Sequence, residues 1–443
     1  MGDIAIGSTL TTKDWFGSIV KAELPPPRTT QIHRVPMILK EHADHDKYYV
    51  PKVVALGPYH HGKPNLKSME GFKPLYTNIL LEGKEDSIRS LHNSLAQLVP
   101  ILRGYYEGGV NHLSDDAFAR MMLLDGCFIL YIIKHIFSMN SKRDTLWLKS
   151  HQIMFIQEDM FLLENQIPYP VLTEVMRIVP YKDWDVDIKR FIDDNILAAE
   201  RRRVKSRAHQ LNDPIPTTTN HLLGLLQTRL TKDRSIDLLP NHRYTFRNVK
   251  ELMEVGIRFK PSQTRTLARI KFTAYTFSAN LQIPAITVDD STKPILLNLV
   301  AYELCSNDHI NTSWVTSYIC LMDSLIDHSD DVKVLRKAGI LDNRLGSDEE
   351  VAQLFNEIGK DLVPNSYVYS EAREAIQKHY DSKRNTWIRQ LKHEYMKTPW
   401  AFIALVAGLM GLFLSSVQTY FSVWGSQSHC DSFCLYLKKH HVP

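Results

Sequence analysis

Apolar residues recur every three or four positions along much of this chain, which is the spacing of one face of an α-helix. In segment 66–82 the apolar face includes Leu75, Ile79 and Leu80, and a similar pattern runs through 86–103. The same periodicity predicts further helices at 116–138, 153–168, 170–179, 185–204, 291–305, 313–328, 330–338, 348–361 and 368–396, with a short helix that ends at 256. The pattern predicts a mainly α-helical chain.

Two of these helices are apolar on more than one face. The centre of segment 116–138, MMLLDGCFILYII, has one charged residue, Asp125, and is too short to cross a bilayer. The second, IMFIQEDMFLLENQIP, fills 153–168 and is expected to end at the prolines that follow. We expect these two helices to pack antiparallel in the centre of a helical, bundle-like domain.

Three runs between residues 256 and 288 favour strands instead. In 267–273, apolar Ile270 and Phe272 alternate with basic residues, as in a strand that is buried on one face. The neighbouring runs 256–259 and 279–288 are also β-like, and Pro284 interrupts the second of them. Together they predict a small antiparallel β-sheet packed on the helices.

The strongest pattern lies near the end of the chain, where residues 400–424 contain no charged side chain. A helix of this length reaches about 37 Å, and the hydrocarbon core of a bilayer is about 30 Å thick. Pro399 suits the first helical position, and Trp400 and Trp424 suit the headgroup regions. A buried core helix is the alternative, but such helices rarely stay uncharged for so long. We expect one transmembrane helix at 398–424, with residues 399–424 in contact with the lipid bilayer.

Basic residues are more frequent before this segment than after it. Those that precede it are Lys383, Arg384, Arg389, Lys392 and Lys397. Only Lys438 and Lys439 follow it. The positive-inside rule therefore predicts a cytosolic N-terminal domain and a short tail outside the cytosol or in a lumen. We expect a single-pass protein of the plasma membrane or an endomembrane.

The five cysteines do not define a site. Cys127, Cys305 and Cys320 lie in apolar segments and are expected to be buried thiols. Cys430 and Cys434 follow the membrane segment. They could be lipidated, could form a disulfide in an oxidising lumen, or could remain unmodified. The sequence has no Cys-x-x-Cys pair, which argues against a zinc ribbon or finger.

The net charge of the chain bears on whether nucleic acid is a partner. A net charge of +4 is small for 443 residues, so no nucleic acid partner is expected. A basic run could still bind nucleic acid or anionic lipid, although a solvated helix end is the favoured interpretation. This run contains Arg201, Arg202, Arg203, Lys205 and Arg207.

The domain organisation follows from these patterns. Three consecutive prolines, 25–27, favour an extended and irregular start. We divide the chain into a flexible arm at 1–30, a helical cytosolic domain at 31–397, the transmembrane helix at 398–424 and a short tail at 425–443.

Histidines near the start of the helical domain are the first candidate for chemistry. They are His33, His42, His45, His60 and His61. Only His42 and His45 have a helical spacing, and adjacent His60 and His61 cannot easily bind one ion. We expect the histidines to hold a loop by hydrogen bonds, and we expect no metal and no cofactor.

Carboxylates within the apolar helices are the second candidate. They are Asp125, Glu158, Asp159 and Glu164. Two carboxylates on facing helices can act as acid and base. A buried charge also needs a partner, and Arg120, His135 or the N–H groups at a helix end could supply one. Structural pairing is the favoured interpretation.

The polar triplet Glu164, Asn165 and Gln166 is the third candidate. It stands at the end of an apolar helix, just before Pro168. We expect it to satisfy carbonyls and amides where the chain turns, in preference to binding a substrate.

Several stretches of this sequence closely resemble a plant family known as domain of unknown function 247. They are IHRVP, YYVPKVVALGPYHHGKPNL, MMLLDGCFILYII, EDMFLLENQIPYPVL, VKELMEVGIRF, LQIPAITVDDSTKPILLNLVAYE and SYICLMDSLIDHSDDVKVLRKAGIL. These motifs contain His60 and His61, then Asp125, Gly126 and Cys127, then the 164–166 triplet, and the resemblance runs from about 32 to 424.

The resemblance implies a plant, membrane-anchored, mostly helical protein. Members of the family that it resembles are implicated in grasses as pollen determinants of self-incompatibility, and others are linked more loosely to growth or stress responses. The family has no established catalytic residues, so none is carried over to this chain.

Signatures of common enzymes, such as a nucleophile elbow, a P-loop or a dinucleotide-binding glycine motif, are absent from the sequence. We therefore expect protein recognition at a membrane, in signalling or cell–cell recognition, with a protein partner. An enzyme that uses the core carboxylates and a scaffold for membrane trafficking are the alternatives.

Overall fold

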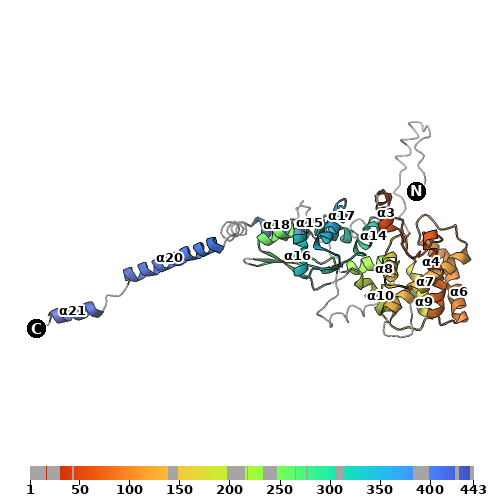
Figure 1. Ribbon diagram of the computed structural model, residues 1–443, viewed down its shortest axis with the longest axis horizontal. Helices are drawn as coiled ribbons and strands as arrows, with labels where there is room; N and C mark the ends of the chain where they lie inside the picture. The colour runs from red at the N-terminus through yellow and green to blue at the C-terminus, as the bar shows by residue number, and fades with distance from the viewer. Residues whose placement is uncertain are drawn as a thin grey trace. The chain divides into compact units, whose positions relative to one another are not determined.

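The structure, a computed structural model of the chain, confirms a mainly α-helical fold with a small β-sheet (Figure 1). It describes residues 16, 30–41, 44–137, 148–196, 215–216, 218–232, 247–264, 266–275, 278–305, 313–382, 399–424 and 429–439. Outside these residues lie most of the predicted arm, His42, the basic run at 201–207 and the basic residues at 383–397.

The chain forms two compact units. Unit 1 contains Met1–Val249, Phe259–Lys271 and Leu281–Arg373. Unit 2 contains Lys250–Arg258, Phe272–Asn280 and Glu374–Pro443. The predicted boundaries at 31–397 and 398–424 stay predictions.

Helix α7, Asp115–Phe137, is the central helix in the first part of unit 1. Nearly every residue between 121 and 133 is buried, as expected for a helix that is apolar on all sides. Four helices pack against it, and Figure 1 shows three of them beside it. The four are α5, Lys73–Leu80; α6, Glu85–Gly104; α9, Tyr169–Ile178; and α10, Trp184–Asp194.

The segment predicted as one helix at 66–82 is divided into shorter elements. These are η1, Pro64–Leu66; α4, Lys67–Glu70; and α5. The buried face of α5 contains Lys73, Tyr76, Thr77 and Leu80. Leu75 and Ile79, which were expected to face the core, are more than a third exposed. The apolar positions were therefore a poor guide to the buried face, because a lysine occupies a place on that face.

The prediction of a helix through 153–168 is wrong in its second half. Helix α8 covers Ser150–Asp159, and residues 160–168 form turns and irregular chain. The predicted antiparallel pairing is also wrong, since α8 is not among the helices that pack along α7. Asn and Asp side chains compete with helical hydrogen bonding, and this run contains Asp159 and Asn165.

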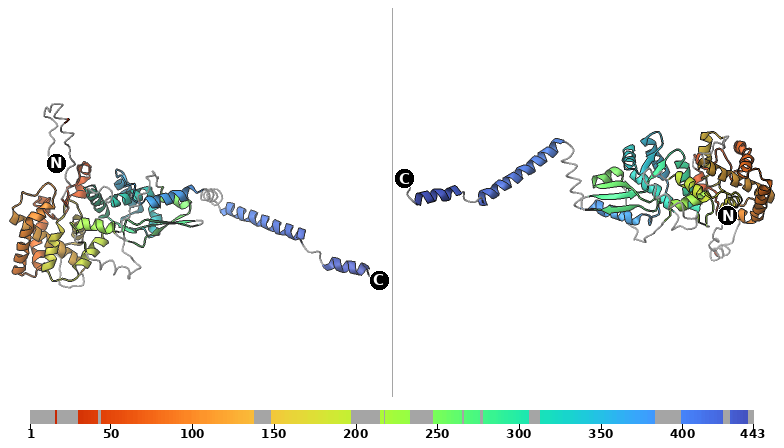
Figure 2. Two further views of the ribbon diagram at one scale, coloured as in Figure 1. Left: turned by 180° about the vertical axis from the view of Figure 1, so that it is seen from behind. Right: turned by 90° about the horizontal axis from the view of Figure 1, so that it is seen from below.

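In the part of the chain that the structure describes, the β-strands form two small sheets (Figure 2). Three strands with the order β1-β3-β2 form a mixed sheet, where an antiparallel one was expected. They are β1, Ile257–Pro261; β2, Lys271–Ala274; and β3, Ala279–Ile283. A second pair is parallel: β4, Ile286–Val288, lies beside β5, Leu341–Asn343, which the sequence did not predict.

The second part of unit 1 contains four helices that the sequence predicted. They are α14, Thr292–Cys305; α15, Trp314–Leu325; α16, Ser329–Lys337; and α17, Asp348–Gly359. Helix α17 packs against α14, α15 and α16. Its N-terminus is well defined, because the side chain of Ser347 accepts a hydrogen bond from the Glu350 N–H.

Unit 2 contains most of α13, Val249–Glu254, and of α18, Ser370–Asp381. Within it, a ring nitrogen of His379 lies 3.1 Å from the carbonyl oxygen of Val255. The same unit contains α20, Pro399–Trp424, and α21, His429–Lys439, a helix in the segment predicted as a tail. Residues predicted to extend α18 to 396 lie beyond the described part.

Candidate functional site

The loop at 50–60 is largely buried but has no regular structure, so its backbone N–H groups need partners from elsewhere. Asp159, the last residue of α8, accepts hydrogen bonds from the N–H groups of Lys52 (2.9 Å), Val53 (2.7 Å) and Val54 (2.9 Å). Burial raises the pKa of Asp159 to about 7, and the three donors oppose that rise. The carboxylate thus fastens the loop to the end of α8.

Asp125 of α7 holds the next part of the same loop. Its Oδ2 accepts from the Gly57 N–H at 2.8 Å, and its Oδ1 lies 2.6 Å from Nζ of Lys73. Lys73 also donates to the Ala55 carbonyl and to Glu70, each at 2.6 Å. Burial alone would lower the pKa of Lys73, but the Asp125 and Glu70 carboxylates raise it above its ordinary value. This buried ion pair joins α5, α7 and the loop.

Asn165 and Gln166 complete this polar network. Asn165 accepts from the Leu56 N–H at 2.7 Å and donates to the carbonyls of Val54 and Asp159. The Gln166 side chain donates to the carbonyls of residues 160 and 162 and accepts from the N–H of Leu223, in α12, Leu222–Leu230. The triplet therefore binds local carbonyls at the turn after α8, and also segments that are distant in sequence.

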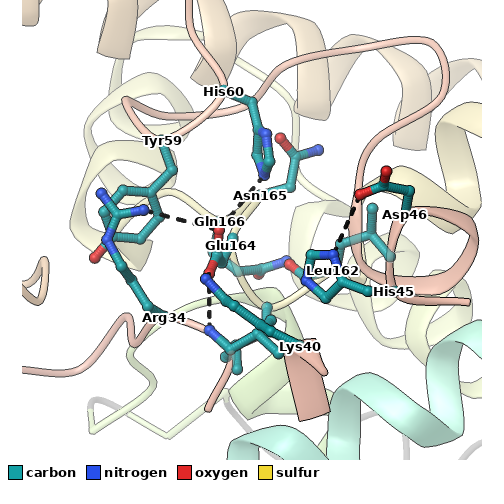
Figure 3. Close-up of polar contacts among 12 residues, drawn as sticks. Arg34, Lys40, His45, Asp46, Tyr59, His60, Leu162, Glu164, Asn165 and Gln166 are labelled. Carbon is teal, nitrogen blue, oxygen red and sulfur yellow. Dashed lines mark hydrogen bonds and ion pairs between the residues drawn. The ribbon is translucent and has the colours of Figure 1, made fainter. Parts of the chain in front are cut away.

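Glu164 is the centre of a separate group of charged residues in Figure 3. Its carboxylate accepts from the Val35 N–H at 2.8 Å and from Nζ of Lys40 at 2.9 Å. Arg34 lies 3.9 Å from it, and its guanidinium also lies over the ring of Tyr59. Burial raises the pKa of Glu164, but Lys40 and the Val35 N–H lower it to below its ordinary value. Glu164 therefore fastens segment 34–40 to the turn after α8.

The histidines do not meet at one point. His60 is buried, 4.0 Å from Glu164, and burial lowers the pKa of His60 to about 4. His61 is exposed, His33 lies 3.6 Å from Glu107, and His45 pairs with Asp46. Among the described residues, no group of three or more His, Cys, Asp or Glu side chains is placed to hold a metal ion.

Gly126 and Cys127 have packing roles in α7. A Cβ atom at Gly126 would lie 2.9 Å from a methyl group of Val171 and 3.3 Å from one of Val175, so the glycine lets α9 approach closely. Cys127 is buried, and burial raises the pKa of its thiol to about 12. A thiol in this state is a poor nucleophile.

The four core carboxylates therefore have separate partners, and they do not converge on one solvent-accessible point. Glu158 pairs with the side chain of Lys52, while Asp125, Asp159 and Glu164 hold the segments described above. Two hollows in the described part of the chain, one along α17 and one beside Tyr131, are lined by other residues. Chemically, the network is suited to holding irregular chain in place.

Lys73 and Lys52 are the partners that the sequence interpretation missed. Arg120 and His135 had been considered for Asp125, but Arg120 pairs with Asp116 at the surface of α7. The helical spacing could have indicated that Lys73 is buried. Lys73 precedes Tyr76, Thr77 and Leu80 by three, four and seven residues, and all three are buried. A lysine in line with such residues indicates a buried cation.

Helix α20 is the second candidate feature. By length and composition, Val406–Trp424 is long and apolar enough to cross a membrane, and none of it is buried. The helix begins at Pro399, and the side chains of Trp400 and Trp424 near its ends are 79% and 73% exposed. Burial of an exposed apolar surface of this size is favourable, so the helix is suited to a membrane or to an apolar partner surface.

Comparison with known proteins places these features in a family. A model described as a plant protein of unknown function, domain of unknown function 247, matches residues 32–414. The chain is 28% identical to the Arabidopsis thaliana protein named UPF0481 protein At3g47200, over 84% of this chain and 82% of the relative. It is 23% identical to the putative UPF0481 protein At3g02645 of the same plant, over 90% and 91%. No solved structure matches the chain.

Proposed function

Because the chain belongs to this plant family of unknown function, its role must be argued from its own structure, and we propose that it is a membrane-anchored protein-recognition module. The observation that carries the proposal is helix α20, with its exposed apolar surface of membrane-spanning length. The basic residues at 383–397 support an orientation with the large N-terminal part in the cytosol. The membrane is the plasma membrane or an endomembrane.

Recognition is favoured over catalysis by the way the polar groups are used. Asp125, Asp159 and Glu164 each accept bonds from backbone N–H groups of distant segments, and these bonds stabilise the fold. A general acid or base has to reach a substrate in a cleft. A large folded unit on a membrane tether, with its core carboxylates engaged internally, is better suited to presenting surfaces to a partner.

The anchor is tested with the full chain and a chain that ends at Lys397, both expressed in plant cells. The full chain is expected to stay in the membrane pellet after a carbonate wash, and the shortened chain is expected to become soluble. Restoring an unrelated transmembrane helix after Lys397 should return the protein to the pellet. A shortened chain that still sediments with membranes would contradict the anchor.

The recognition role is tested with a biotin ligase fused to the N-terminus of the anchored protein. We expect labelling of a reproducible set of cytosolic-side proteins, and we expect this set to change when the chain ends at Lys397. As a control, the ligase is fused to an unrelated membrane anchor. If this control labelled the same proteins, specific recognition would be contradicted.

A further inference from the structure

A groove of about 510 Å³ runs along helix α17 in unit 1. Residues 327–329, which lead into the first turn of α16, line one side, and the face of α17 lines the other. On that face, Glu349, Gln353, Asn356 and Lys360 recur at intervals of four, three and four residues, so they form one stripe. The stripe is about 16 Å long, which is the length of about five residues of extended peptide.

The floor of the groove is formed by a small side chain. Ala352 of α17 lines the groove and is 5% exposed. The longer side chains of Glu349 and Gln353 beside it are exposed and form the rim. A small residue between longer ones leaves room for an apolar part of a ligand.

The groove is acidic, although the whole chain carries a net charge of +4. Asp327, Glu349 and Glu357 line it with Lys360, giving a formal charge of −2. Glu357 is already paired with Lys293. Within the described part of the chain, no cation forms an ion pair with Asp327 or Glu349, which contact the neutral side chains of Asn248 and Ser329.

The N-terminus of α16 at the groove does not favour an anion in place of a cation. The Asp331 carboxylate already accepts hydrogen bonds from the N–H groups of Asp327 at 3.1 Å and His328 at 3.2 Å. This carboxylate therefore occupies donors that an anionic ligand would need. An added anion would also meet the carboxylates of Asp327 and Glu349.

We propose that this groove binds a basic peptide segment of a partner protein, with an arginine side chain placed between Asp327 and Glu349. The planar guanidinium group matches carboxylates with directed hydrogen bonds, and the aliphatic part of the arginine suits the floor at Ala352. The inference rests on the proposed recognition function and names the surface and the chemistry of the partner.

The test uses the full chain in lipid nanodiscs and a fluorescent peptide of three Arg-Gly-Ser repeats. The reference peptide has citrulline in place of arginine, which keeps the shape and removes the charge. We expect the arginine peptide to bind the wild-type chain at least tenfold more tightly than the citrulline peptide. The double variant Asp327→Asn, Glu349→Gln should weaken arginine-peptide binding about tenfold, because each exposed ion pair contributes several-fold at most.

A matched control separates the groove from general acidity. Glu85→Gln with Asp86→Asn makes the same charge change in the first turn of α6, where both residues are exposed. This control should bind the arginine peptide as the wild type does. Gln353→Arg, which places a guanidinium group in the groove, should abolish binding while leaving the thermal unfolding temperature unchanged.

Equal weakening in the groove variant and in the control would overturn the inference, as would full binding by Gln353→Arg. The membrane anchor of the proposed function is tested separately, by the carbonate wash of the full and the shortened chain. Peptide binding in nanodiscs does not depend on where the protein resides in the cell, so each hypothesis can fail alone.

Discussion

In one irregular segment of this protein, the backbone N–H groups donate to buried carboxylate and amide side chains and not to a neighbouring β-strand. The backbone N–H groups of residues 52–54, 56 and 57 are bound by the side chains of Asp159, Asn165 and Asp125. A buried N–H without a partner costs about 1–3 kcal/mol, so each of these side chains is important for stability. The role of a buried acidic residue in this fold is therefore to hold backbone.

The Asp125–Lys73 pair gives a prediction at this scale. Asp125→Ala should lower the free energy of unfolding by about 3–5 kcal/mol, because Lys73 is left buried without its main counter-charge. The double variant Asp125→Ala, Lys73→Met should recover part of that loss, since it removes both charges. Chemical denaturation of the four chains in a double-mutant cycle measures the coupling.

This cycle also decides between structure and catalysis at Asp125. If Asp125→Ala kept the stability of the wild type, the structural role assigned to the residue would be wrong, and an enzyme would again have to be considered. Lys73→Met alone provides the remaining corner of the cycle and should be destabilised to a similar extent.

Glu303 gives a prediction about pH. It is a buried residue of α14 and accepts hydrogen bonds from two N–H groups in the first turn of α15, those of Val315 at 2.8 Å and Thr316 at 2.9 Å. Burial raises its pKa to about 7. The folded pKa is above the unfolded value, so the stability it contributes is full below about pH 4.5 and is lost as pH rises through 7. The advantage of the wild type over Glu303→Gln should therefore shrink between pH 4.5 and 7.

Urea unfolding of both chains across this pH range measures the difference, which changes by at most about 1.4 kcal/mol per pH unit. Glu85→Gln, at an exposed position of α6, is the control and should show no such trend. An advantage of the wild type that grows with pH would mean that the N–H donors, and not burial, dominate the pKa of Glu303.

At the level of elements, the sequence predicted those that depend on local periodicity. Helices α6, α7, α9 and α14 to α17 all lie in the predicted segments, because each has its own apolar face. The end of α8 and strand β5 depend on tertiary partners instead. Gln166 holds the turn after α8 against the first turn of α12, and β5 pairs with a strand more than 50 residues earlier, so no local pattern could indicate them. Helix α12 has a local apolar run, LLGLLQTRL, which the sequence interpretation missed.

The same contrast applies to the candidate site. The sequence identified Asp125, Glu164, Asn165 and Gln166 as polar residues in an apolar setting that would need partners. Their long-range partners could not be assigned, because an irregular loop has no periodicity that fixes which N–H meets which acceptor. The order of strands in the mixed sheet was inaccessible for a similar reason.

Two glycines in the loop between α3, His45–Tyr49, and η1 allow a matched test of close packing. Gly57 and Gly62 both have positive φ, 73° and 79°. A Cβ atom at Gly57 would lie 2.6 Å from the Gln166 carbonyl oxygen, while one at Gly62 would meet nothing within 4 Å. Gly62→Ala should therefore cost about 1 kcal/mol from backbone strain alone, and Gly57→Ala clearly more.

Thermal unfolding of the two variants measures this difference. Equal losses would mean that the loop moves away from Gln166 without cost, and that the hydrogen bonds made by Asp125 and Asn165 do not fix its position.

Helix α20 gives a prediction about membrane insertion. Leu412 is near its middle and is 69% exposed. Leu412→Arg should reduce insertion, because a charge at the centre of a spanning helix costs about 2.5–3.5 kcal/mol. Ser422→Arg, near the end, should have little effect, since its side chain can reach the headgroups. The carbonate-resistant fraction of each variant is the measurement, and equal fractions would contradict a central position for Leu412.

At the scale of the whole molecule, the family match covers residues 32–414 and so extends from the fastened loops into the apolar helix. The two Arabidopsis relatives are matched over more than four-fifths of their lengths. The family match therefore includes both the helical part of the chain and the first part of the apolar helix. This continuity is the reason to test orientation on the complete chain and not on its parts.

The chain contains its own reporter of orientation. Asn311-Thr312-Ser313 is a glycosylation sequon in the large N-terminal part, and a second sequon can be added after Pro443. The proposed orientation keeps Asn311 in the cytosol, so only the added site should be glycosylated, and Asn311→Gln should leave the mobility unchanged. Removal of glycans with an endoglycosidase, read as a shift on a gel, measures both sites at once. Modification of Asn311 with an unmodified C-terminal site would reverse the orientation, and it would also move the acidic groove to the other side of the membrane, where its basic partner would then have to be sought.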